Sequence, residues 1–83
     1  MALLKLSRGA WRSIDNASQE GLRPTFHVSK VEARRWNWVL SMRYWIASGE
    51  QIKVLLRTAQ DRESLEALRA YLEEQHPPPV GAN

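Results

Sequence analysis

The stretch from Arg35 to Ala47 constrains the fold of this chain more than any other part, because apolar residues occupy every second position in it. The apolar even positions are Trp36, Trp38, Leu40, Met42, Tyr44 and Ile46. The mostly polar odd positions are Arg35, Asn37, Val39, Ser41, Arg43 and Trp45. A period of two is typical of a β-strand with one buried face, whereas helical steps of three and four would split the apolar set between opposite sides. The stretch therefore predicts a long strand whose even residues face the core.

Two shorter strands are expected on either side of it. Proline fixes its own backbone and moves the preceding residue out of the helical region, so Arg23-Pro24 marks a boundary and a strand over Thr25 to Lys30 follows. In that strand the inward residues are Phe26 and Val28, and the outward ones are His27 and Ser29. A third strand is expected over Gln51 to Thr58, with Ile52, Val54 and Leu56 inward and Lys53, Leu55 and Arg57 outward.

The turn Ser48-Gly49-Glu50 sets the expected register of the last two strands. A loop of an odd number of residues keeps every apolar pair on one face, whereas a two-residue loop would bury a lysine against Tyr44. With the loop at 48–50, the expected inward pairs are Ile46 with Ile52, Tyr44 with Val54, and Met42 with Leu56. The expected outward pairs are Trp45 with Lys53, Arg43 with Leu55, and Ser41 with Arg57.

A helix is expected over residues 1–21, because apolar residues recur there at steps of three and four and Gly21 supplies a stop. The stripe consists of Leu3, Leu6, Ala10, Ile14 and Ala17, with Trp11 beside it. Two alternatives remain open: a strand over Ala2 to Leu6 followed by a shorter helix, and a basic targeting peptide, against which Asp15 and Glu20 argue.

The final helix has the clearest pattern. Its apolar stripe is Leu65, Leu68 and Leu72, with Tyr71 at the edge. Thr58 or Asp61 is expected to cap its start, and the expected ion pairs are Arg62 with Glu66 and Arg69 with Glu73. Pro77 to Pro79 ends it, and the tail from His76 is expected to be disordered.

These elements predict an α+β fold: an N-terminal helix, a three-stranded antiparallel β-meander and a C-terminal amphipathic helix packed on one face of the sheet. Residues 1–76 are expected to form one small domain and 77–83 a Pro-rich tail. The chain of 83 residues contains no cysteine, which excludes disulfides and thiolate chemistry and fits a cytoplasmic setting. No apolar run approaches the length of a membrane span.

The net charge of +3 is unevenly distributed. Residues 1–60 carry ten Lys and Arg against four acids, and residues 61–83 carry two against five. Such a bias favours an acidic partner by long-range attraction, although a dedicated nucleic-acid binder usually has a denser basic stripe.

Nothing in the sequence predicts catalysis. His27 and His76 have no acid or second histidine at metal-ligand spacing, and no glycine-rich phosphate loop or nucleophile motif is present. We therefore expect a protein that is not an enzyme and uses no cofactor or metal.

The predicted outer face of the sheet is the best candidate for function, because arginine and tryptophan dominate interface hot spots. Its candidate partner-binding residues are Arg35, Asn37, Arg43, Trp45, Lys53, Leu55 and Arg57. The leading interpretation is a non-catalytic module that engages or inhibits a protein partner. The alternatives are nucleic-acid binding by the same face, a structural protein that forms homodimers, and a solvated face without a partner.

The order helix, three strands, helix resembles the double-stranded-RNA-binding domain, but that family relies on a lysine cluster at the start of its last helix, where this chain has Asp61-Arg62-Glu63. The stretch from Trp36 to Glu74 is similar in architecture to the arm-type DNA-binding domains of phage integrases, without their hairpin motif. Small size and a basic aromatic face are also similar to phage-encoded inhibitor proteins. These resemblances concern layout alone and identify no family.

Overall fold

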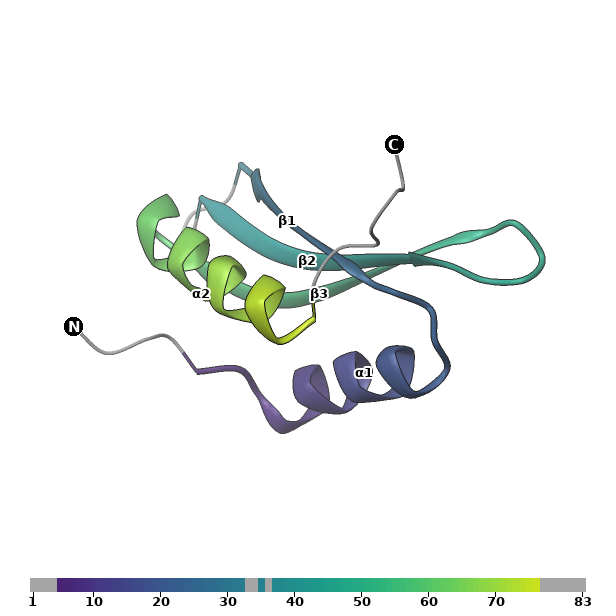
Figure 1. The fold of residues 1–83 in the computed structure, drawn as a ribbon. Coiled ribbons are helices and arrows are strands. Elements are labelled where there is room, and N and C mark those ends of the chain that lie inside the picture. The colour runs from purple at the N-terminus through teal and green to yellow at the C-terminus, as the bar shows by residue number, and fades with distance from the viewer. Residues whose placement is uncertain (1–4, 33–34, 36, 77–83) are drawn as a thin grey trace.

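The computed structural model describes residues 5–32, 35 and 37–76. The elements in chain order are α1 (Arg8–Gln19), β1 (Thr25–Lys30), β2 (Trp38–Trp45), β3 (Gln51–Ala59) and α2 (Arg62–Gln75). The three strands form one antiparallel sheet in the order β1-β2-β3, which is a β-meander (Figure 1). The predicted α+β layout is confirmed.

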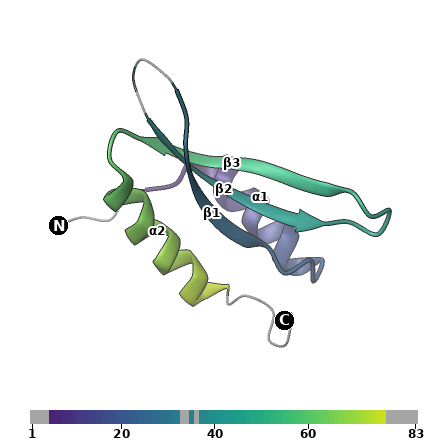
Figure 2. The ribbon, with the colours of Figure 1, turned by 90° about the horizontal axis from the view of Figure 1, so that it is seen from above.

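One hydrophobic core joins both helices to the face of the sheet that carries the even residues of β1 and β2. The buried members are Leu6, Ala10, Ile14, Ala17, Phe26, Leu40, Met42, Leu56, Leu65, Leu68 and Leu72. Figure 1 shows both helices on the same side of the strands, and Figure 2 shows α2 running alongside β1. The predicted apolar stripes of the two helices and of the central strand therefore meet in one core, as far as the described residues extend.

Helix α1 is shorter than the helix expected over residues 1–21. Ser7 caps its start by accepting a hydrogen bond from the amide of Ala10 at 3.1 Å. At its end the amide of Leu22 donates to the carbonyl of Ala17 at 3.0 Å, and Gly21 has a φ of 72°. This pattern is a Schellman motif, which needs a left-handed residue after the helix and places the next apolar residue against the last turn. The strand expected as an alternative over Ala2 to Leu6 lies mostly outside the described residues.

Strand β2 is shorter than the predicted stretch from Arg35 to Ala47. Arg35 and Asn37 lie in bends before the strand, and the amide of Val31 donates to the carbonyl of Asn37 at 2.7 Å. That bond closes the connection between β1 and β2, so the residues that the period of two assigned to the strand are used to reverse the chain. Trp36, expected in the core, lies outside the described residues, whereas Trp38 packs against the core.

The hairpin between β2 and β3 has the predicted odd parity but a different register. The amide of Ile46 donates to the main-chain carbonyl of Glu50 at 3.0 Å, and the amide of Gly49 donates to the main-chain carbonyl of Ile46 at 2.9 Å. The loop therefore consists of residues 47–49 and not 48–50. A three-residue hairpin loop places its left-handed residue third, and Gly49 has a φ of 93°. The loop therefore begins one residue earlier, and every pair shifts by two.

The shift corrects all six expected pairs. Tyr44 faces Ile52 and Met42 faces Val54 on the core side, and Ile46 has no partner in β3. On the other side Trp45 faces Gln51, Arg43 faces Lys53, and Ser41 faces Leu55.

A β-bulge then changes the parity of the second half of β3. Leu40 faces Arg57 while the next residue, Ser41, faces Leu55, so Leu56 is the extra residue. Arg57 therefore lies on the core side, where its guanidinium donates to the carbonyl of Lys5 at 2.6 Å. The expectation that Arg57 belongs to the outer face is wrong.

Helix α2 begins where it was predicted to begin. Asp61 caps it by accepting from the amide and hydroxyl of Ser64 at 2.9 and 2.7 Å, and these bonds hold the pKa of Asp61 below its usual value. Glu66 pairs with Arg62 at 3.3 Å as expected. It also pairs with Arg69 at 3.0 Å, so the expected pair of Arg69 with Glu73 is replaced by a pair three residues apart.

His76 does not belong to a disordered tail. It is the C-cap residue of α2, and its amide donates to the carbonyl of Leu72 at 2.8 Å. The ring lies with its Nδ1 at 2.9 Å from the hydroxyl of Ser18 in α1, and its centroid is 6.3 Å from that of Phe26. His76 thus joins the ends of the two helices to β1.

Candidate binding surface

The face of the sheet opposite the core, which we name the reverse face, collects the side chains that alternate with the core residues. Its members are Thr25, His27, Ser29, Val39, Ser41, Arg43, Trp45, Gln51, Lys53, Leu55 and Thr58. The centre of this face is closed, because Val39 and Ser41 are both buried. The exposed part is the half nearer the hairpin.

Four side chains in that half form what we name the hairpin patch: Arg43, Trp45, Lys53 and Leu55. Trp45 is 62% exposed and Leu55 is 58% exposed, which makes them the two most exposed large apolar side chains among the described residues. Scattered exposed apolar residues are normal in proteins, but two of this size on one face beside cations form an apolar and basic surface. Sequence parity predicts the face on which Trp45 lies but not whether another segment covers it.

The two cations of the hairpin patch face each other across β2 and β3. Like charges directly opposite on neighbouring strands destabilise a sheet. Among the described residues of the reverse face there is no aspartate or glutamate to compensate them. The Nε atom of Arg43 is also buried without a hydrogen-bond partner in the described part of the chain. This part of the reverse face is therefore basic, and no acid among its described residues offsets the two charges.

His27 reports the same electrostatic environment. Its Nε2 lies 2.8 Å from the hydroxyl of Thr25. Burial lowers the pKa of His27, and the positive charges of Arg43, Arg69 and Lys53 lower it further, while Glu73 acts in the opposite direction. The neutral imidazole is thus favoured next to the hairpin patch.

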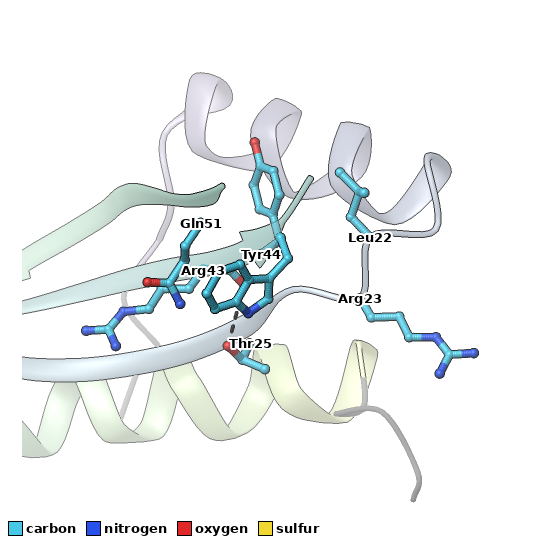
Figure 3. A pocket seen from close by; sticks show the side chains of 7 residues that line it. Leu22, Arg23, Thr25, Arg43, Tyr44 and Gln51 are labelled. Atoms are coloured by element: carbon cyan, nitrogen blue, oxygen red, sulfur yellow. Dashed lines mark hydrogen bonds between the residues drawn. The ribbon is translucent and has the colours of Figure 1, made fainter. Parts of the chain in front are cut away.

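A hollow of about 360 Å³ lies beside the hairpin patch, where the end of α1 and the start of β1 approach the hairpin (Figure 3). We name it the hairpin hollow. Its apolar wall is formed by Leu22, Tyr44 and Trp45. The side chains of Thr25, Gln51, Arg23 and Arg43 complete the lining. The hydroxyl of Thr25 donates to the carbonyl of Arg43 at 3.4 Å, which is a long hydrogen bond.

Arg23 reaches the hollow through an unusual backbone conformation. Its φ is 51°, in the left-handed region that side chains other than glycine rarely adopt. The conformation arises where the Schellman motif of α1 meets the buried Pro24. In Figure 3 the guanidinium groups of Arg23 and Arg43 extend away from each other.

The structure brings together four of the seven residues predicted to bind a partner, namely those of the hairpin patch. Arg35 and Asn37 are exposed, but they precede β2. Gln60 Nε2 donates to the main-chain carbonyl of Arg35 at 2.9 Å, and the amide of Asn37 donates to the main-chain carbonyl of Ala59 at 3.3 Å. Arg57 lies on the core side. Sequence reasoning missed Leu22 and Arg23, for which the only signal was their place between a helix-ending glycine and a proline.

Within residues 5–32, 35 and 37–76, no three His, Asp or Glu side chains lie close enough together to hold a metal ion. No helix in the same part of the chain is long and apolar enough to cross a membrane. The fold defines the class as a small α+β protein with a three-stranded meander. Comparison of the chain with protein-family models, with curated proteins and with solved structures finds no match.

Proposed function

We propose that this protein is a non-catalytic binding module that engages or inhibits a protein partner through the hairpin patch. One observation carries the proposal: two large apolar side chains, Trp45 and Leu55, are exposed beside two cations that no acid of the same face neutralises, among the described residues. Tryptophan and arginine contribute most to interface hot spots, because each combines a large contact area with a polar group.

The charge of the patch also limits what the partner is. In a two-fold contact between copies of the chain through this patch, Arg43 and Lys53 of one copy would approach the same residues of the other. Like-charge contact across an interface costs affinity, whereas an acidic partner gains both association rate and specificity. We therefore favour an acidic partner over a homodimer formed through this face, and sedimentation equilibrium is expected to give a monomer mass.

Affinity capture from host lysate treated with nuclease tests the proposal. The bait is the full chain, compared with the double variant Trp45→Ala, Leu55→Ala and with Arg12→Gln, which removes one exposed charge from α1 on the far side of the sheet. The double variant is expected to fold and to lose a protein that the wild type and Arg12→Gln both retain. Capture of the same proteins by all three baits would refute the proposal that the hairpin patch binds a protein partner.

Nucleic-acid binding by the same face is the second candidate, and it is favoured by the unpaired cations next to an exposed indole, on which an unpaired base could stack. Anisotropy titrations with single-stranded and duplex oligonucleotides separate the two. Phosphate contacts require an affinity that decreases steeply with salt and is lost in Lys53→Thr. Weak binding that does not depend on salt would remove this candidate.

A further inference from the structure

The hairpin hollow has an apolar wall and a basic rim. Leu22, Tyr44 and Trp45 form the wall, and the volume of about 360 Å³ is at the small end of the range of ligand pockets. An apolar side chain of a partner fits a site of this size and lining. When such a side chain fills the hollow, water leaves the three apolar side chains of the wall. Burial of the partner's side chain would therefore supply binding energy.

The rim determines what surrounds that side chain. In Figure 3 the guanidinium groups of Arg23 and Arg43 extend away from each other, and neither points across the hollow toward the other. A single phosphate or carboxylate needs donors that converge on it, which this arrangement does not offer. An extended peptide rises about 3.3 Å per residue and can place an acidic side chain on each side of a central apolar one. Arg23 and Arg43 both line the hollow, so each guanidinium can meet one of those acids.

We propose that the hairpin hollow receives one apolar side chain from an extended segment of the partner protein, and that acidic residues on both sides of it in the segment bind Arg23 and Arg43. The inference rests on the proposed function and adds to it the chemistry of the partner. It makes Arg23, which the protein holds in a left-handed backbone conformation, a specificity-determining residue.

Arg23→Gly is a sharp test of this role. Glycine adopts a φ of 51° without a steric penalty, so the variant removes the guanidinium and relieves the backbone at the same time. It is expected to unfold at the same temperature as the wild type or at a higher one. A loss of binding in this variant would therefore come from the missing guanidinium and not from a damaged fold.

The experiment uses a phage-displayed library of random heptapeptides, selected on the wild type, Trp45→Ala, Arg23→Gly and Arg12→Gln. The wild type and Arg12→Gln are expected to enrich peptides with an aromatic or aliphatic residue between acids. The best peptide, synthesised with a fluorophore, should bind Trp45→Ala roughly tenfold more weakly and Arg23→Gly about three- to tenfold more weakly. Replacing its central residue by alanine or its acids by lysine should abolish binding.

Enriched peptides without acids, or peptides that bind Trp45→Ala as well as the wild type, would overturn the inference. So would selection of no peptide at all. If capture of the native partner still depends on Trp45 and Leu55 in that case, the module stands and only the assignment of the hollow fails. If oligothymidylate competes with the selected peptide and binds more tightly than the peptide, the hypothesis of nucleic-acid binding replaces both the protein-binding module and the peptide site in the hollow.

Discussion

Replacing Lys53 by threonine should make the protein more stable and a poorer binder at the same time. Lys53 is exposed and lies directly opposite Arg43 on the reverse face. Threonine removes the repulsion between them and has a higher preference for strands than lysine. A residue kept only for the fold would give the opposite result on stability.

The size of the effect follows from Coulomb's law. Two unit charges at about 8 Å repel by about 0.5 kcal/mol in a medium as polar as water. For a domain of this size, that amount corresponds to an increase of roughly 2–4 °C in the unfolding temperature. In 1 M salt the Debye length is about 3 Å, so the repulsion should decrease to about a tenth. The part of the gain that comes from charge should nearly vanish, and only the difference in strand preference should remain.

Thermal unfolding followed by circular dichroism at low and high salt measures both quantities. The control is Lys30→Thr, which removes an exposed strand lysine that faces Trp38 and not a cation. Anisotropy with an acidic peptide measures the loss of binding. A lower unfolding temperature for Lys53→Thr, or a gain that does not change with salt, would refute the view that the two cations oppose each other in the free protein.

Three further changes test other parts of the structure. Leu40→Ala, at a fully buried position of β2, should lower the free energy of unfolding by about 2–5 kcal/mol in denaturant titrations, and a smaller loss would contradict the placement of the core. Gly49→Ala should cost about 1–2 kcal/mol because φ is 93° there, whereas Gly9→Ala inside α1, with open space around it, should add about 0.5–1 kcal/mol; equal effects would contradict the hairpin. Because the pKa of His27 is lowered in the folded protein, the unfolded chain binds more protons as pH falls below about 6.5, so stability should decrease with acidification in the window between the two pKa values, and His27→Asn should flatten that slope.

The core could be predicted because it depends on periodicity alone. Leu40 and Met42 have to share a face in any strand, and Leu65, Leu68 and Leu72 have to share a face in any helix, whatever the register. The same parity placed all four residues of the hairpin patch on the side away from the core, so this part of the candidate site followed from it.

The pairing across the hairpin depends on finer rules. A loop of three residues was expected, but the left-handed residue of such a loop is its third, and Gly49 therefore fixes the start of the loop at position 47. This information was present in the sequence, and its use would have placed Lys53 opposite Arg43. The bulge at Leu56 has no comparable signal, because no glycine or proline marks it and Leu55 and Leu56 are both acceptable on an apolar face.

The hairpin hollow could not be predicted, because its wall combines the end of α1 with the end of β2. Leu22 and Arg23 arrive there through the direction in which the Schellman motif releases the chain and through the burial of Pro24. These are tertiary consequences, and the sequence shows only that a helix stops and a strand begins nearby.

The bulge has a consequence for how the protein tolerates changes in chain length. Because Leu56 adds one residue to β3, the alternation of inward and outward side chains is reversed after it. Lys53 and Leu55 point away from the helices, and Arg57 points toward them. Deletion of Leu56 would restore one regular alternation along the whole strand and would leave Arg57 opposite Leu40 on the core side, where its hydrogen bond to Lys5 is made. In a strand without a bulge, the loss of one residue would turn every later side chain to the opposite face, so Leu56 is the position at which β3 can be shortened while its inward and outward residues keep their sides.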